Sequence, residues 1–155
     1  MRVRIAISAA LLLLGLTGCA VPSSPDARDW RRSARQSVGD VASEVETART
    51  TLRQLGADRF VGGYSTVLLV DAEEAAGKAT DSITTQQPPR VEQARYDEVS
   101  AALGDATDLV AQARIAVARG SEQDYPALVE DLGTTGDELA ELEEQLTRAP
   151  DGGTR

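Results

Sequence analysis

The segment SARQSVGDVASEVETARTTLRQLG, residues 33–56, decides the fold class of this chain. Its apolar residues are separated alternately by four and three positions, which places all of them on one side of an α-helix. This spacing predicts a helix over about residues 26–55 that ends at Gly56, because glycine is common just after helix C-termini. The stripe consists of Ala34, Val38, Val41, Val45, Ala48, Leu52 and Leu55.

The same alternation recurs twice in the second half of the chain and predicts two more amphipathic helices. In residues 89–119, which Gly120 is expected to terminate, the stripe is Val99, Leu103, Ala106, Val110, Ala113 and Val117. In the last helix it is Tyr125, Leu128, Leu132, Thr135, Leu139, Leu142 and Leu146. Ser121 followed by Asp124 resembles a capping box that would begin this last helix. Gly133 and Gly136 weaken its interior, so its continuity is left open.

Residues 58–83 carry a broader and less regular apolar face. Asp58 is a candidate N-cap, although Gly62 and Gly63 move the expected helix start toward Ser65. The short run VLLV has strand propensity, but the alanine-rich continuation favours a single helix. The positions expected to be buried are Phe60, Tyr64, Val67, Leu68, Ala72, Ala75, Ala79 and Ile83.

Four helices joined by short loops predict an all-α fold, an up-down-up-down four-helix bundle, over residues 26–149. The alternation of three and four is also the spacing of coiled-coil packing. The last six residues, 150–155, are polar and glycine-rich and are expected to form a disordered tail.

The N-terminal residues precede this bundle and have a different character. Arg2 and Arg4 are followed by a short apolar run and then by LTGC, residues 16–19. This order is that of a secretory signal peptide, and the run is short for a helix that crosses a bilayer.

LTGC resembles the lipobox of bacterial lipoproteins. The resemblance implies that a signal peptide, residues 1–18, is cleaved between Gly18 and Cys19, and that Cys19 becomes a lipid-modified N-terminus. Two or more acyl chains would hold the protein stably on the extracytoplasmic face of the cell membrane. Residues 19–25 would then be the lipidated cysteine and a short tether, AVPSSP.

The composition excludes several classes of function. The chain contains no histidine and one cysteine, so a Cys/His metal site and a Ser–His–Asp or Cys–His nucleophile are excluded. There are 16 Lys+Arg and 25 Asp+Glu; removal of Arg2 and Arg4 leaves 14 basic side chains and a net charge of −11. Such an acidic body argues against binding to nucleic acid. We therefore expect no cofactor, no metal and no catalytic residue.

Three groups of residues remain as candidate sites. Asp71, Glu73 and Glu74 lie beside an apolar run, and residues 137–146 carry five acidic side chains. We interpret both groups as solvated helix faces; the alternatives are an interior acid at Asp71 and a divalent-cation site in 137–146. The aromatic residues Trp30, Tyr64, Tyr96 and Tyr125 are interpreted as core packing, the alternative being a ligand pocket lined by Trp30 and Tyr64.

A cluster of arginines is expected on one face at the start of the first helix: Arg28, Arg31, Arg32 and Arg35. Positive charge at a helix N-terminus opposes the helix dipole, so we expect compensation. One source is the anionic membrane close to the tether. The other is the acidic last helix, which ends beside the first helix in this topology. We favour intramolecular pairing with Glu141, Glu143 and Glu144, because the sequence supplies these acids at the appropriate end.

The sequence thus predicts a lipid-anchored, non-enzymatic helical module that binds or positions another envelope protein. An alternative is a bundle that binds a small apolar ligand or a cation at the membrane surface. A third possibility is an enzyme that uses carboxylates alone. The expected partners are the membrane, through Cys19, and an envelope protein, with no nucleic acid.

Overall fold

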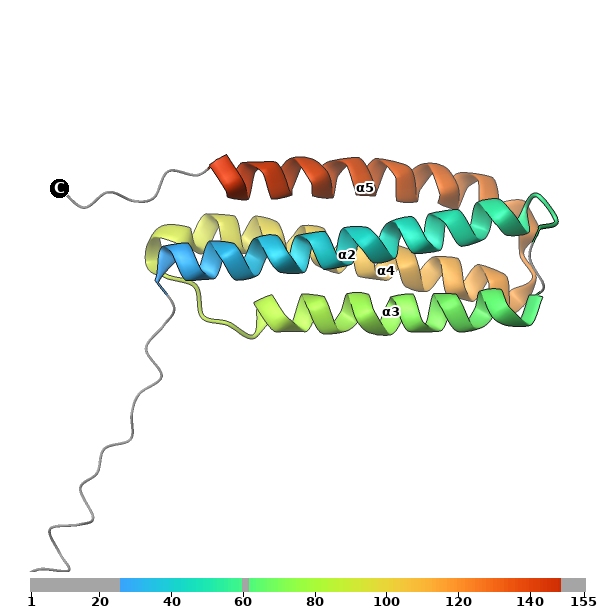
Figure 1. Ribbon diagram of the computed structural model, residues 1–155, viewed down its shortest axis with the longest axis horizontal. Helices are drawn as coiled ribbons and strands as arrows, with labels where there is room; N and C mark the ends of the chain where they lie inside the picture. The colour runs from blue at the N-terminus through green and yellow to red at the C-terminus, as the bar shows by residue number, and fades with distance from the viewer. Residues whose placement is uncertain (1–25, 60–61, 149–155) are drawn as a thin grey trace, which may run out of the picture.

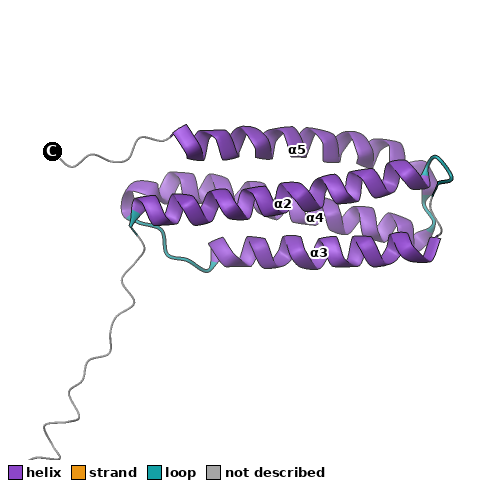
Figure 2. Ribbon diagram, viewed as in Figure 1, coloured by secondary structure: helices purple, strands orange, loops and turns teal. Residues whose placement is uncertain are grey.

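The computed structural model describes residues 26–59 and 62–148, which form a bundle of four helices (Figure 1). The helices are α2 (Ala27–Leu55), α3 (Gly62–Thr84), α4 (Gln93–Arg119) and α5 (Tyr125–Arg148). Neighbouring helices run in opposite directions, and the regular elements within the described ranges are all helical (Figure 2). The expected signal peptide, the lipidated Cys19, the tether and the tail lie outside the described residues.

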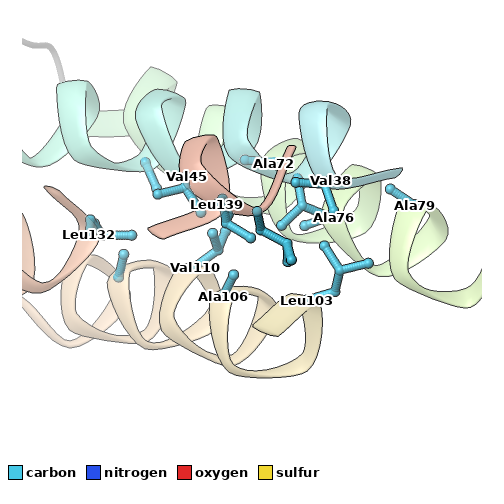
Figure 3. Packing of buried hydrophobic residues seen from close by; sticks show 14 of the residues in the cluster. Val38, Val45, Ala72, Ala76, Ala79, Leu103, Ala106, Val110, Leu132 and Leu139 are labelled. Atoms are coloured by element: carbon cyan, nitrogen blue, oxygen red, sulfur yellow. The ribbon is translucent and has the colours of Figure 1, made fainter. Parts of the chain in front are cut away.

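The predicted stripes of α2, α4 and α5 are confirmed as the buried faces of these helices. Their valines, leucines and alanines meet side chains from α3 in one continuous core, part of which Figure 3 shows. Leu55 and Val117, which lie near helix ends, and Thr135 in the middle of α5 are only partly buried. Many core positions are alanine, which lets helices approach closely. Accordingly, α2 contacts not only its neighbours α3 and α5 but also α4 across the bundle.

The buried face of α3 differs from the expected one. Tyr64 and Val67 are exposed, whereas Leu69 and Ala76 are buried in place of Leu68 and Ala75, which are only half-buried. The actual stripe again alternates four and three: Ser65, Leu69, Ala72, Ala76, Ala79 and Ile83. The buried face is displaced by one residue from the expected one at three positions, so that Ser65, Leu69 and Ala76 are buried next to the expected Tyr64, Leu68 and Ala75. Phe60 lies outside the described residues.

The helix starts also differ in detail. The extended backbone of Pro89 is followed by a 3-10 turn, Arg90–Glu92, so α4 begins at Gln93 rather than at Pro89. The capping-box prediction is wrong, because Ser121 makes no side-chain capping hydrogen bond and a 3-10 turn, Glu122–Asp124, precedes α5. Asp58 lies in the preceding turn with a positive φ of 53° and does not adjoin α3.

The fourth helix is continuous through both of its glycines. α5 runs from Tyr125 to Arg148 without a break at Gly133 or Gly136. Pro126 lies in the first turn, where a missing backbone N–H is tolerated. A methyl group at Gly136 would meet Val45 of α2 at 3.9 Å, so this part of α5 packs directly on α2.

Candidate functional site

One end of the bundle is formed by three segments. These are the start of α2, the connection 85–92 between α3 and α4, and the end of α5, which the alternating helix directions bring together (Figure 1). We call this the N-terminal end of the bundle. Six residues, 20–25, separate Cys19 from Asp26.

Asp26 fixes the point at which the chain becomes helical. Its Oδ1 accepts hydrogen bonds from the backbone N–H groups of Arg28, at 2.9 Å, and Asp29, at 2.8 Å. These two groups have no partner within the helix, so the side chain satisfies them as an N-cap. The first helix therefore begins firmly at Ala27, directly after the expected tether.

Arg31 is the buried member of the arginine cluster, and its partner is Glu92. The Nε of Arg31 donates to the backbone oxygen of Ala27 at 3.1 Å and lies 3.8 Å from Oε1 of Glu92. The Arg31 side chain is 9% exposed and the Glu92 side chain 7%. The other oxygen of Glu92 accepts a hydrogen bond from Arg95 at 3.0 Å. Glu92 thus ties the start of α2 to the start of α4.

The remaining arginines of the cluster, Arg28, Arg32 and Arg35, are exposed. Arg32 forms an ion pair with Asp29 at 3.2 Å. In α5, Glu144 pairs with Arg148 of its own helix, and this carboxylate raises the pKa of Arg148. The inter-helix acid that meets the cluster is therefore Glu92 rather than one of the α5 acids that the sequence suggested. Glu92 was missed although it lies seven residues before Val99, where the α4 stripe would continue.

Two aromatic side chains close the same end of the core. Trp30 is fully buried, and its ring centroid lies 6.5 Å from that of Tyr96, with the planes tilted by 50°. Tyr96 donates a hydrogen bond to the backbone oxygen of Thr84 at 2.8 Å. The indole Nε1 of Trp30 is buried without a hydrogen-bond partner among the described residues. These contacts confirm Trp30 and Tyr96 as packing residues.

The two other tyrosines lie at the opposite end of the bundle. Tyr125 is buried at the start of α5, and this burial, with a smaller effect of Glu122, raises the pKa of its hydroxyl. Tyr64 is 60% exposed at the start of α3. Trp30 and Tyr64 therefore do not line one pocket.

The acidic residues of α3 have three different environments. Asp71 is exposed, as the helix-face interpretation predicts. Glu74 is bonded to Lys78 at 2.6 Å, and this hydrogen bond, with the lysine charge, lowers the pKa of Glu74. Glu73 forms two hydrogen bonds with Arg114 of α4, through Nε and Nη2 of the guanidinium, and raises the pKa of Arg114. This pair between helices was not predicted, because it depends on how α3 and α4 are rotated.

The acidic segment 137–146 lies along the outside of α5. Leu139, Leu142 and Leu146 point into the core, and the acids between them are exposed or half-buried. Within 26–59 and 62–148, no group of three or more His, Cys, Asp or Glu side chains is arranged to hold a metal ion.

Grooves between neighbouring helices lie on the surface of the described part of the bundle, and two of them include several charged side chains. The groove between α2 and α3 has a volume of about 410 Å³ and is lined by Asp40, Glu44 and Lys78, among others. Partial burial, and to a lesser degree Asp40, raises the pKa of Glu44. The groove between α4 and α5 has a volume of about 500 Å³ and includes Arg119, Asp124 and Asp131. Neither groove is an enclosed apolar cavity of the kind that holds a small apolar ligand.

An exposed apolar face lies on the first half of α3. Tyr64 is 60% exposed, Val67 54% and Val70 45%. Steps of three place these residues on one outer side of the helix. We call them the α3 apolar face. A shallow groove that contains Val70, Gly77 and the Glu73–Arg114 pair adjoins this face between α3 and α4.

Comparison of the sequence and structure with known proteins identified no relative of this chain. No family model, no curated protein and no solved structure matches this chain. Among the helices in the described ranges, none is long and apolar enough to cross a membrane.

Proposed function

We propose that this chain is a lipid-anchored cell-envelope protein whose helical bundle binds another envelope protein without performing catalysis. The observation that carries the proposal is LTGC at residues 16–19, directly after a signal-like segment and shortly before a capped helix start at Asp26. This arrangement supports an anchor on Cys19 with a rigid domain close behind it. The complete lack of histidine supports a binding role over a catalytic one.

The surface best suited to a protein partner is the α3 apolar face. Contiguous exposed apolar residues on a small domain mark interaction surfaces. Val67 precedes Thr84, at the N-terminal end of the bundle, by 17 residues of α3, which is on the order of 25 Å of helix. The face would therefore project away from the membrane. The exposed acid beside it, Asp71, favours a partner surface that combines apolar and basic side chains.

In vivo photo-cross-linking tests this role. A photoreactive amino acid at Val67, on the α3 apolar face, should cross-link the anchored protein to one discrete partner. The same amino acid at Gln145, exposed on α5, serves as the matched control and should not. Val67→Glu should abolish the complex, as probed through a cross-linker at the adjacent Tyr64. Equal cross-linking from Val67 and Gln145, or a complex that survives Val67→Glu, would contradict the assignment of this face.

A further inference from the structure

We infer that the bundle stands upright on the membrane, with the α3–α4 connection in contact with anionic lipid headgroups and Val91 at the point of contact. This inference rests on the proposed lipid anchor and specifies the orientation in which that anchor holds the domain.

Val91 is the first reason. It is 82% exposed, the highest exposure among the large hydrophobic residues that the structure describes as exposed. It lies in the 3-10 turn Arg90–Glu92, directly after Pro88 and Pro89. Its neighbour Glu92 is turned inward and held by Arg31 and Arg95. Because Glu92 is fixed in the interior, Val91 is held outward, where water is its only environment unless another surface covers it.

The charges at this end are the second reason. Arg90 is exposed and forms no ion pair with another described residue. Three acids at this end are occupied by other groups: Asp26 caps α2, Asp29 pairs with Arg32, and Glu92 is buried between two arginines. A basic side chain next to an exposed valine is a combination that suits the interface of an anionic bilayer.

The geometry of the anchor is the third reason. Residues 20–25 reach at most about 20 Å from Cys19 to the start of α2, which lies at the same end as the α3–α4 connection. The flanks of the bundle are acidic and are repelled by anionic headgroups, so an orientation flat on the membrane is disfavoured. The opposite end supplies a contrast, because its 3-10 turn is Glu122–Asp124 with the sequence EQD.

Site-specific fluorescence distinguishes an upright orientation of the bundle from one in which it lies flat on the membrane. The thiol of Cys19 would be consumed by lipidation, so a single introduced cysteine is the only one available for labelling. Val91→Cys and Gln123→Cys occupy the two opposite 3-10 turns and form a matched pair. Each full mature protein, labelled with a polarity-sensitive dye, is reconstituted into vesicles of phosphatidylglycerol and phosphatidylcholine that contain a headgroup-linked quencher.

The dye at position 91 should be quenched strongly and the dye at position 123 should not. In the Val91→Cys background, Arg90→Gln should lower the ratio of quenched to unquenched dye about fivefold, as expected for the loss of one basic contact with an anionic surface. Vesicles of phosphatidylcholine alone should lower it similarly. Equal quenching at positions 91 and 123, in protein that floats with the vesicles, would overturn the orientation alone. Mature protein that carries no lipid and does not float would overturn the anchor itself.

Discussion

At the scale of single residues, the most consequential contact is the one made by Glu92. It neutralises Arg31, which is buried, and also bonds Arg95, so two helices and the α3–α4 connection depend on one carboxylate. The sequence did not reveal this role, because Glu92 is a charged residue at a position where the α4 stripe would continue, three residues after Pro89. Pairing between helices depends on their relative rotation, which a single amphipathic pattern does not determine. The same limit applies to Glu73 and Arg114.

Replacement of Glu92 by glutamine should therefore destabilise the domain markedly. The change removes the carboxylate charge that lies 3.8 Å from the buried Arg31 guanidinium, and breaking a buried ion pair from one side costs about 3 kcal/mol. Urea unfolding of a fragment of residues 26–149, followed by circular dichroism, measures the free energy of unfolding. Glu98→Gln, at an exposed position of α4, is the control and should have little effect. Equal losses in the two variants would show that Glu92 has no special role.

Replacement of Glu44 by glutamine should instead stabilise the domain, because the charged form of Glu44 is disfavoured in the folded state. Burial and Asp40 raise its pKa above the ordinary value of 4.5. Glu44→Gln should thus stabilise the fold at neutral pH, where the native carboxylate is charged. The gain should fade as the pH falls through the raised pKa and disappear below the unfolded pKa, since the carboxyl is then protonated in both states. Thermal melts of both proteins between pH 3 and pH 7 measure the gain in stability at each pH. A gain that persists unchanged at pH 3 would refute this explanation.

At the scale of helices, three of the four buried faces could be predicted from the sequence and the fourth was misplaced. α2, α4 and α5 place their larger apolar residues on a regular stripe, so hydrophobicity and helical period agree. In α3 the two signals conflict: the period selects Ser65 and Ala76, whereas hydrophobicity favours Tyr64 and Val67. Packing buries Ser65 and Ala76, which leaves Tyr64 and Val67 exposed.

Two aspartate substitutions in α3 test this face directly. Leu69→Asp places a charge at a fully buried position and should unfold the fragment, since a buried unpaired charge costs several kcal/mol. Val67→Asp, two residues away and 54% exposed, should leave the melting temperature nearly unchanged. Circular dichroism melts of both variants measure the difference. A stable Leu69→Asp variant together with an unfolded Val67→Asp variant would restore the face that the sequence suggested.

At the scale of the whole molecule, the bundle is a short rigid body with two dissimilar ends. One end, which six residues separate from Cys19, carries Arg90 and Val91, and the other lies near the α3 apolar face. The bundle could be predicted because apolar residues recur at the helical period in each of the four segments. Short loops join these segments, which favours helices that pack side by side. The ion pairs between helices and the exposed apolar residues could not be predicted. They depend on how the helices are rotated against one another and on which residues remain outside the core.

The proposed function depends most on the lipid anchor, and metabolic labelling tests this anchor most directly. Cells that express the full chain are grown with a clickable fatty acid, and the protein is isolated and examined for the label. We predict that the wild-type protein carries the label in the membrane fraction and that Cys19→Ala abolishes both the label and cleavage after Gly18. Label that persists in Cys19→Ala, or wild-type protein that is secreted without label, would contradict the anchor and the proposed function built on it.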